Sequence, residues 1–423
     1  MSFKNFKFHQ KIIAGIDACG YTTPTPIQKE AIPPILAGKD IFGLAQTGTG
    51  KTAAFVLPLL QRLLDSPEKK EQALIMAPTR ELAEQIHDNI LKMAGNTGLK
   101  SVVIYGGVSK QPQIKAIRNG VDIIVACPGR LLDLLNDKRT RLGNIKVLIL
   151  DEADHMLDQG FLPDIRRIIK LLPVNRQSLV FSATMPKEIR LLAQNILQNP
   201  ITIQVEHNLP APTISHALFQ VAKESKTALL KSILEDDKMK CTLVFTRTKH
   251  KAKNLARQLE SAGLKAASIQ GNLSQTNRQK ALNGFKDGTY TILVATDIAA
   301  RGIDVLGISH VVNYDMPDTT ETYTHRTGRT GRASRTGQAI SFVCQEDTKI
   351  LTLIERTLGK KMHQEQPACF PTSLPASIAA TPVKKTFTGK KRTIKDHSYK
   401  NQRTPDTKHP RRSCLWSESL VLA

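Results

Sequence analysis

Short runs of apolar residues alternate with amphipathic stretches through residues 40–205 of the chain. The runs are IFGLA, ALIMAP, SVVIYGG, DIIVACP, VLILDEAD and SLVFSAT, and each precedes a segment with helical spacing. Apolar strands without polar alternation are typical of a parallel sheet that is covered on both faces, and their alternation with helices indicates βαβ units. The pattern predicts an α/β domain with a doubly wound parallel sheet.

The same alternation begins again after residue 213, with the runs HALFQVA, CTLVFTRT, KAASIQG, YTILVATD, HVVNYDMP and QAISFV. We therefore expect a second α/β domain over residues 214–360 and a cleft between the two domains. Residues 206–213 (EHNLPAPT) place two prolines among polar residues, which is typical of an interdomain linker. An ordinary surface loop is the alternative.

The chain is strongly basic, with 60 Lys or Arg against 37 Asp or Glu and a net charge of +23. This excess favours a polyanionic partner, with nucleic acid ahead of an anionic membrane. No apolar run reaches the length of a bilayer span, and residues 1–15 lack the apolar stretch of a signal peptide. The six cysteines show no CxxC pair or zinc-site spacing. We expect reduced thiols in a soluble, cytoplasmic protein without a membrane partner.

The C-terminal part of the chain differs from the rest in composition. Periodicity fades beyond about residue 360, and residues 383–412 carry eleven Lys or Arg against two Asp. Such a segment cannot bury enough apolar surface to fold alone. We predict a disordered basic tail over residues 361–423, which is either an arm for polyanions or an inert solvated segment.

A glycine-rich segment follows the strand IFGL and opens the next helix. Its residues are Ala45, Gln46, Thr47, Gly48, Thr49, Gly50, Lys51 and Thr52. Such a loop directs backbone N–H groups and a helix N-terminus at phosphate oxygens, while its Lys reaches the β- and γ-phosphates and its hydroxyl coordinates Mg²⁺. Ala45 replaces the usual first Gly, and a coincidental Gly/Thr turn is the alternative.

Carboxylates follow the strand VLIL directly, at Asp151, Glu152 and Asp154. Ligands of parallel sheets bind at the carboxyl ends of the strands. Asp151 would hold Mg²⁺, and Glu152 would orient or deprotonate the water that attacks the γ-phosphate. Acidic loops are common after strands, but the pairing with a phosphate-binding loop in the same array favours catalysis.

The segment HRTGRTGR, residues 325–332, places three arginines and two glycines in eight residues of the second domain. Hydrolysis requires cations beside the charge that develops on the γ-phosphate. If these arginines act from the opposite domain, ATP hydrolysis requires closure of the cleft. A surface basic turn that binds RNA, or nothing, is the alternative.

In this order, AQTGTGKT, DEAD, SAT, ATDIAARGID and HRTGRTGR resemble the DEAD-box ATP-dependent RNA helicases over residues 1–350, and most closely the bacterial RhlE-like subgroup. Further matches are GYTTPTPIQ, PTREL, Gly106-Gly107, PGR, VFTRT and the segment from Gln275 to Arg278. The resemblance implies two tandem RecA-like domains that use ATP and Mg²⁺. Residues 1–30 would recognise adenine, residues 31–205 would bind ATP, and residues 214–360 would form the helicase C-terminal domain.

The same resemblance implies roles for individual residues. Gln28 would read the adenine edge, Phe3 would pack on the base, and Asp304 would contact the ribose. Lys51, Asp151, Glu152, Arg329 and Arg332 would be catalytic, the two arginines acting on the γ-phosphate. Coupling of hydrolysis to closure would fall to Ser182, Thr184 and His325. RNA contacts would come from Thr79, Arg80, Gly107, Gly129, Arg130, Arg247, Arg278 and Thr296.

Three residues depart from the family pattern. Cys127 replaces the usual Thr before Pro128, Gln270 replaces the usual His before Gly271, and Thr327 replaces the common Ile. Loss of a hydroxyl at Cys127 would weaken one RNA contact, whereas none of the three removes a catalytic group.

These observations predict an RNA-stimulated ATPase that closes on RNA and unwinds short duplexes locally, with little sequence preference. Ribosome assembly or RNA turnover, with partner proteins from these pathways, is the expected setting. A non-enzymatic RNA clamp and a processive DNA-translocating helicase are the rivals. The intact Lys51, Asp151, Glu152 and Arg332 argue against the first, and Gln28 with the DEAD pattern argues against the second.

Deletion of residues 375–423 should weaken RNA binding and flatten its salt dependence, because basic residues that contact phosphates release counterions. Basal ATP hydrolysis should be unchanged. Titration of RNA at several salt concentrations, with full-length and shortened protein, measures both quantities. An unchanged affinity and salt slope would identify the tail as inert.

Overall fold

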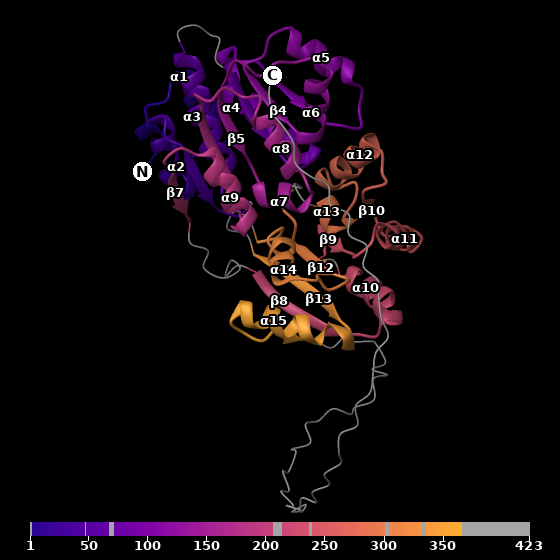
Figure 1. Cartoon of the computed structure of the whole chain (residues 1–423). Coiled ribbons are helices and arrows are strands. Elements are labelled where there is room, and N and C mark those ends of the chain that lie inside the picture. Colours follow the sequence, from indigo (N-terminus) through magenta and orange to yellow (C-terminus); the bar gives the residue numbers. More distant parts are fainter. Residues whose placement is uncertain are drawn as a thin grey trace, which may run out of the picture. The chain divides into compact units, whose positions relative to one another are not determined.

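The computed structural model of the 423-residue chain describes residues 2–46, 48–66, 72–205, 214–236, 239–300, 305, 307–331 and 336–365 (Figure 1). We call residues 2–205 lobe 1 and residues 214–365 lobe 2. The expected linker at 206–213 and residues 366–423 of the expected tail lie outside the described residues. No helix among the described residues is long and apolar enough to cross a membrane.

Lobe 1 is built on a parallel sheet with the strand order β3-β4-β2-β5-β6-β1-β7. Its strands are β1 (Ile41–Leu44), β2 (Gln72–Met76), β3 (Ser101–Ile104), β4 (Ile123–Ala126), β5 (Ile145–Leu150), β6 (Gln177–Ser182) and β7 (Ile201–Gln204). Strands β1, β4 and β6 are buried along their whole length because helices cover both faces. In β2, Ala73 and Ile75 belong to one core cluster, and Leu74 and Met76 to the other.

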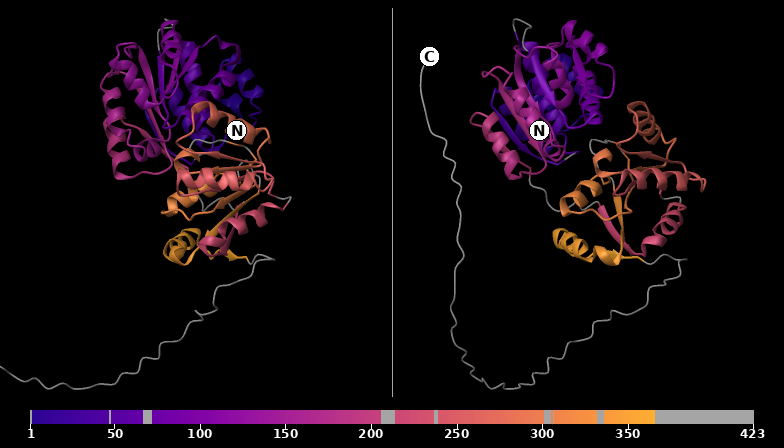
Figure 2. Two further views of the ribbon diagram at one scale, coloured as in Figure 1. Left: turned by 90° about the vertical axis from the view of Figure 1, so that its right-hand side faces the viewer. Right: turned by 45° about the vertical axis from the view of Figure 1, so that its right-hand side comes forward.

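The helices of lobe 1 divide between the two faces of its sheet (Figure 2). One face carries α1 (Gln10–Ala18), α2 (Pro26–Leu36), α3 (Lys51–Asp65) and α4 (Arg80–Ala94), with the short 3₁₀ helices η1 (Phe3–Phe6) and η2 (Gly95–Thr97). The other face carries α5 (Lys110–Arg118), α6 (Pro128–Asn136), α7 (Ala153–Asp158), α8 (Leu162–Ile169) and α9 (Lys187–Ile196). A Cβ atom at Gly43 of β1 would lie 2.5 Å from the Phe181 ring, which explains a glycine inside this strand.

Lobe 2 repeats the plan, with the strand order β10-β11-β9-β12-β13-β8-β14, again parallel. Its strands are β8 (Ile214–Gln220), β9 (Thr242–Phe245), β10 (Ala266–Ile269), β11 (Ile292–Ala295), β12 (His310–Asn313), β13 (Gly337–Val343) and β14 (His363–Gln364). Its helices are α10 (Lys226–Leu234), α11 (Lys249–Glu260), α12 (Gln275–Lys286), α13 (Asp297–Ala300), α14 (Thr320–Thr327) and α15 (Thr348–Leu358), with η3 (Lys223–Ser225) and η4 (Gln345–Asp347). Helices α10 and α11 cover one face, and α12 and α13 cover the other.

The predicted fold class is confirmed: two parallel sheets with flanking helices lie in tandem, and each apolar run found in the sequence contains a strand. The sequence patterns missed β7 and β14, which lie at the edges of their sheets. The strand β14 falls inside the range 361–423 that the sequence assigned to the tail. The domain boundaries as such stay predictions.

Candidate nucleotide and RNA site

Three strand ends meet at one edge of lobe 1. The order β5-β6-β1 makes these strands neighbours, and each ends in one of the predicted motifs. The carboxylates follow β5, the Ser-Ala-Thr segment follows β6, and the glycine-rich loop follows β1. Because the strands are parallel, all three carboxyl ends point the same way. The Ala45 amide donates to the Ser182 carbonyl at 3.0 Å, which joins the second and third segments directly.

The glycine-rich loop leads into α3 through two residues with positive φ, Gly48 at +88° and Gly50 at +92°. L-residues with a side chain rarely adopt this conformation, so the turn requires glycine. The Lys51 side chain is 5% exposed, and its ammonium donates to the Ala45 carbonyl at 2.9 Å, across the mouth of the loop. The Thr49 hydroxyl donates to the Gln46 carbonyl at 2.8 Å. The next residue, Thr52, lies on the first turn of α3, whereas Thr47 lies outside the described residues.

The predicted adenine reader contacts this loop from α2. The Gln28 side chain is buried, accepts from the Thr25 amide at 2.9 Å and donates to the Gly50 carbonyl at 3.1 Å. One amide side chain therefore joins the start of α2 to the loop that precedes α3. Phe3 lies in the core, stacked on Tyr21 with ring centroids 6.2 Å apart. The Phe3 ring is therefore packed against Tyr21 in the core, and its face is not open to solvent.

The carboxylates after β5 are removed from water, with Asp151 and Glu152 each 2% exposed. Burial raises the pKa of Asp151 to about 6, against the opposing effect of Lys51, because a charged carboxylate loses its hydration in a low-dielectric site. Burial alone would also raise the pKa of Glu152, but the hydrogen bond and charge of His155, with Lys51 and Arg329, outweigh it and lower that pKa. Glu152 is therefore ionised well below neutral pH, whereas Asp151 gains a proton as the pH falls through about 6.

Glu152 adopts a left-handed conformation, with φ at +55° and ψ at +53°, at the residue that caps α7. A non-glycine residue pays an energetic cost in this region and keeps the conformation only where the surrounding structure enforces it. Such residues cluster at functional sites. The Glu152 amide donates to Asp151 Oδ1 at 3.0 Å, and Glu152 Oε2 lies 2.8 Å from His155 Nδ1 one turn along α7. These contacts aim the Glu152 side chain.

Asp154 connects the carboxylate motif to the segment after β6. Its Oδ2 atom accepts from the amides of Ala183 and Thr184 at 3.2 and 2.9 Å and from the Thr184 hydroxyl at 3.1 Å. The Ser182 hydroxyl donates to the Thr184 carbonyl at 2.6 Å. One carboxylate therefore holds the whole Ser-Ala-Thr turn against α7, so that a movement of either segment acts on the other.

In lobe 2 a similar edge is formed by β11, β9 and β12, which are neighbours. Arg326 of α14 is buried there, and its guanidinium donates to Asp297 Oδ2 at 2.8 Å, Asn313 Oδ1 at 3.1 Å and the Asp315 carbonyl at 2.7 Å. Charge-assisted bonds of this kind are the strong ones in protein interiors. Arg326 thus ties the end of α14 to two strand ends and to the predicted RNA-contact region at Thr296.

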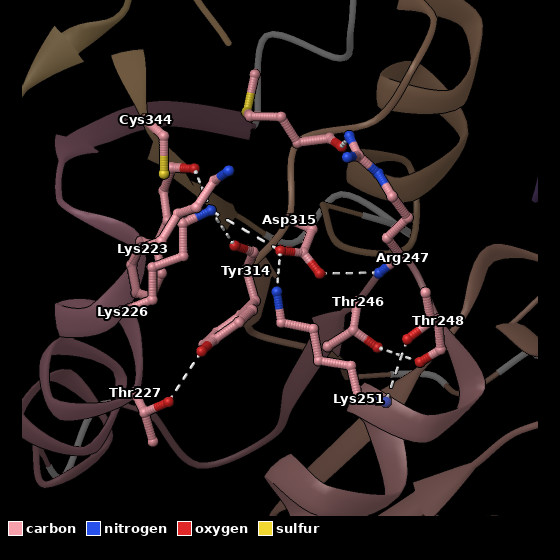
Figure 3. Close-up of polar contacts among 12 residues, drawn as sticks. Lys223, Lys226, Thr227, Thr246, Arg247, Thr248, Lys251, Tyr314, Asp315 and Cys344 are labelled. Atoms are coloured by element: carbon pink, nitrogen blue, oxygen red, sulfur yellow. Dashed lines mark hydrogen bonds and ion pairs between the residues drawn. The ribbon is translucent and has the colours of Figure 1, made fainter. Parts of the chain in front are cut away.

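The predicted RNA contact Arg247 follows β9, and Figure 3 shows what holds it. Its amide donates to Asp315 Oδ2 at 3.0 Å, while Lys251 donates to Asp315 Oδ1 at 2.7 Å. The buried Lys226 donates to the Tyr314 carbonyl at 2.8 Å and lies 3.8 Å from the same Oδ1 atom. Asp315 is thus the centre of a buried charge network that holds the Arg247 backbone, while the Arg247 side chain stays exposed.

The predicted RNA contacts of lobe 1 gather around Gly107. A Cβ atom at Gly107, whose φ is +79°, would lie 2.3 Å from the Arg80 guanidinium. The Arg130 guanidinium donates twice to the Val108 carbonyl at 3.1 Å, and Thr79 caps α4 by accepting from the Leu82 amide at 3.2 Å. Gly129 lies in the first turn of α6 beside Arg130.

Residues predicted to contact RNA from the two lobes are paired with partners from the opposite lobe. Arg278 Nε donates to Glu81 Oε1 at 2.7 Å, and Arg80 donates to the Gln275 side chain at 3.1 Å. Both pairs join α4 to α12. A phosphate group that approaches either guanidinium must compete with these hydrogen bonds.

The arginine-rich motif of lobe 2 reaches the carboxylates of lobe 1. Arg329 is buried, and its charge contributes to the lowered pKa of Glu152. The His325 ring meets the His155 ring edge-on, with centroids 5.2 Å apart. The other two predicted ATP contacts of lobe 2, Asp304 and Arg332, lie outside the described residues.

Several residues that shape the site were missed by the sequence analysis, namely His155, Glu81, Asp315 and Asp297. Arg326 was noted only as one of the three arginines of HRTGRTGR, and its structural pairing with Asp297 was not predicted. The only local signal was their position next to a motif: His155 follows DEAD, and Glu81 lies inside PTREL. Asp315 carried no signal, because its partners come from α11 and from the segment that follows β9, more than 60 residues away.

The three departures from the family pattern take ordinary structural roles. Cys127 is buried at the start of α6, and burial raises the pKa of its thiol to about 12, so the sulfur stays neutral. Gln270 accepts from the Asn272 amide at 2.7 Å, and the Thr327 hydroxyl donates to the Tyr323 carbonyl at 3.0 Å. Cys127 makes no side-chain cap bond to α6.

Comparison with known families agrees with this geometry. The DEAD/DEAH box helicase model matches residues 25–192, and the helicase conserved C-terminal domain model matches residues 225–334. The matched segments contain the glycine-rich loop, the carboxylates and the buried Arg329. The fold and the site thus define a helicase of the DEAD-box class.

Individual relatives give the same result. The chain is 41% identical to the ATP-dependent RNA helicase CshA of Listeria monocytogenes, over 86% of this chain and 70% of the relative. It is 44% identical to the RNA helicase CrhR of Synechocystis, over 81% of this chain and 70% of the relative. A structure of S. cerevisiae Dbp5 bound to RNA and ADP BeF3 is 32% identical, with a TM-score of 0.77, over 86% of this chain and 95% of that one.

The chain therefore belongs to the DEAD-box ATP-dependent RNA helicases, which are ATP-hydrolysing enzymes. The predicted family is confirmed, and so are its tandem RecA-like domains. The two relatives named here are bacterial, whereas the RhlE-like subgroup stays a prediction.

Substitution of Gly50 by Ala should weaken ATP binding. The new Cβ atom would lie 2.5 Å from Gln28 Nε2 at a φ of +92°, so the loop must shift or lose its bond to Gln28. Left-handed strain of about 1–2 kcal/mol corresponds to roughly a tenfold loss of affinity. Titration with a fluorescent ATP analogue measures this loss.

The matched control is Gly98→Ala, which imposes a similar φ of +81° but meets nothing within 4 Å and lies away from the loop. It should bind the analogue as the wild type does. Equal affinities for all three proteins would show that the loop does not depend on the glycine.

Proposed function

We propose that this helicase couples RNA-stimulated ATP hydrolysis to closure of its two lobes, and that closure separates short RNA duplexes locally, without processive movement. The observation that carries the proposal is the meeting of the glycine-rich loop, the buried carboxylates and the Ser-Ala-Thr turn at one sheet edge. Ribosome assembly or RNA turnover in the cytoplasm is the proposed setting, with partner proteins from these pathways.

In the proposed ATP complex, the amides of residues 45–50 surround the phosphates, and Lys51 leaves the Ala45 carbonyl to reach the β- and γ-phosphates. Gln28 already contacts the loop through Gly50, which supports its role beside the adenine. Phe3 packs on the base in this proposal only if its ring leaves Tyr21 or the base approaches its edge. Asp304 would contact the ribose.

The donor set near the loop fits Mg²⁺, which prefers hard oxygen ligands. Asp151 is a buried carboxylate whose raised pKa indicates that nearby cations do not fully balance its negative charge. Thr52 offers a hydroxyl at the start of α3. Asp151 and Thr52 would hold the ion. When bound, Mg²⁺ would neutralise charge on the β- and γ-phosphates.

For the hydrolytic step, Glu152 orients or deprotonates the attacking water. Its lowered pKa keeps it ionised, and its left-handed backbone and bond to His155 fix its direction. Arg329, whose charge already acts on Glu152, would move to the γ-phosphate together with Arg332. These cations stabilise the charge of the transition state.

The proposed coupling runs through Asp154. Because this carboxylate holds the amides of Ala183 and Thr184, a shift of α7 on hydrolysis would move the Ser-Ala-Thr turn. Ser182 and Thr184 would transmit the shift, and His325 would sense it from lobe 2. Loss of the γ-phosphate would thereby release the closed state.

RNA would be held by guanidiniums, hydroxyls and backbone amides, which recognise the sugar–phosphate backbone and carry no sequence information. Arg80, Gly107 and Arg130 supply this surface in lobe 1 with Thr79 and Gly129, and Arg247, Arg278 and Thr296 supply it in lobe 2. The buried Asp315 network supports the role of Arg247, because it fixes the backbone while the guanidinium stays exposed. Dbp5, the similar protein described above, has been solved with RNA and ADP BeF3.

Steady-state ATP hydrolysis tests this proposal, measured alone and with single-stranded RNA or DNA of equal length. RNA should stimulate turnover more than DNA does. Glu152→Gln should lower kcat by about 10²–10⁴, the usual contribution of a positioned acid or base, while ATP binding persists. Unwinding of a short RNA duplex should fall in parallel.

Each rival makes a different prediction in the same assay. Tight RNA binding without ATP turnover would favour an RNA clamp and contradict the role given to Glu152. Stronger stimulation by DNA would favour a DNA-translocating helicase. Unwinding yields that stay high as the duplex is lengthened would contradict local, non-processive action.

Mg²⁺ should bind more weakly as the pH falls through about 6. The raised pKa means that Asp151 holds a proton below this pH, and a cation must displace it. The free Mg²⁺ concentration that half-saturates ATP hydrolysis should therefore rise by about tenfold per pH unit below 6. Separate titration of ATP with Mg²⁺ at each pH corrects for the nucleotide, and a constant half-saturation from pH 7.5 to 5.5 would contradict the assignment.

A further inference from the structure

His155 has an unusual environment for a residue that the proposed ATP cycle uses only as a support for Glu152. It lies on α7 and is 1% exposed. Its Nδ1 atom lies 2.8 Å from Glu152 Oε2. An ionised carboxylate can only accept a hydrogen bond, so Nδ1 carries the proton. A metal ion binds only the neutral form of the ring, in which this leaves the lone pair on Nε2.

The Nε2 atom has no hydrogen-bond partner among the residues that the structure describes. Buried polar atoms are almost always paired, and an exception indicates an unfilled ligand or water position. The lone pair of a histidine that is oriented by a carboxylate through its other nitrogen is the usual arrangement of a metal ligand. In this arrangement Glu152 is the outer partner and Nε2 the inner donor.

Two further donors lie at the same place. Asp154 and His325 each offer a ligand atom, and together with the His155 atom these lie within 4.8 Å of one another. The Asp154 Oδ2 atom accepts three hydrogen bonds, whereas among the described residues Oδ1 accepts one, from the His155 amide at 3.1 Å. A carboxylate oxygen retains lone pairs under such conditions.

The geometry points to a transition-metal site, and we propose that Asp154, His155 and His325 bind Zn²⁺. Two imidazole nitrogens and one carboxylate oxygen are a common zinc donor set, with water in the remaining position. Mg²⁺ prefers oxygen donors throughout, so this site is chemically distinct from the one proposed at Asp151 and Thr52. The ligands come from both lobes, with two on α7 and one on α14.

Bound zinc would act on catalysis from outside the ATP contacts. It would fix the His155 ring that orients Glu152, and it would tie α14 to α7 when the lobes must separate to release products. Zinc should therefore slow ATP turnover at saturating Mg²⁺. This consequence rests on the proposed function, whereas zinc binding itself does not.

Equilibrium dialysis of the reduced full-length protein against low micromolar Zn²⁺, with excess Mg²⁺ and without nucleotide, tests the site. Cysteine thiols also bind zinc, so the comparison is between variants. His155→Gln and His325→Gln should each bind about one zinc ion fewer per chain than the wild type, because a site with three protein ligands loses most of its affinity with one. His87→Gln is the matched control, since His87 is a partly buried histidine whose Nδ1 is also hydrogen-bonded, to the Ser101 hydroxyl at 3.0 Å.

Cobalt absorption identifies the ligands independently. In the Co²⁺-loaded protein, the His155→Gln substitution should abolish a d–d absorption band. No thiolate charge-transfer band should disappear with it. Zinc inhibition of ATP turnover should weaken in the same variant by about tenfold or more. Failure of the ATPase assay with intact zinc binding would reject the proposed function and leave the metal site in place.

Equal zinc binding by the wild type and both variants would overturn the proposal. A thiolate charge-transfer band in the part of the Co²⁺ spectrum that the His155→Gln substitution abolishes would also overturn it. If circular dichroism shows that His155→Gln is unfolded, His325→Gln decides alone, because His325 is only partly buried and its replacement leaves the core of lobe 1 unchanged.

Discussion

Compensation of buried charge at the carboxyl edges of two parallel sheets is the constraint on which the rest of this structure depends. Parallel strands deliver every loop that follows them to one edge, so Lys51, Asp151, Glu152 and Asp154 arrive together where little water reaches them. A buried ion without a partner costs several kcal/mol. The hydrogen bonds of Asp154 to the Ser-Ala-Thr turn, and of Glu152 to His155, offset that cost and also connect the segments that must move together.

Lobe 2 solves the same problem with the opposite sign. Arg326 and Lys226 are buried cations, and Asp297 and Asp315 are the carboxylates that compensate them. In lobe 1 the compensated groups are themselves the residues assigned to ATP, whereas in lobe 2 they lie underneath the exposed Arg247, which we assign to RNA. The interior network therefore sets the positions of residues such as Arg247 without contacting RNA itself.

Most of the fold was predictable because each central strand is an apolar run between helical patterns. The two missed strands have a physical reason in common. In β7 three of four residues are exposed, and β14 consists of His363 and Gln364, so neither has the apolar pattern of a buried strand. Their extended conformation comes from pairing with β1 and β8 at a sheet edge, which no local pattern encodes.

The phosphate loop and the carboxylates were predictable because their chemistry depends on consecutive residues. Asp315 and Glu81 were not, because their partners are distant in sequence.

In the proposed RNA complex, the pairing of Arg278 with Glu81, and of Arg80 with Gln275, would set a threshold for RNA binding. Each guanidinium is already engaged by a partner on the opposite lobe, and the Glu81 carboxylate would remain near any phosphate that replaced it. Like charges at this distance repel, so RNA gains from Arg278 only if Glu81 turns away or the lobes shift. The same argument would explain how the proposed sequence-independent surface can still be selective. A single-stranded backbone that contacts both lobes at once replaces both pairs together, whereas a ligand held by one lobe leaves one pair in place.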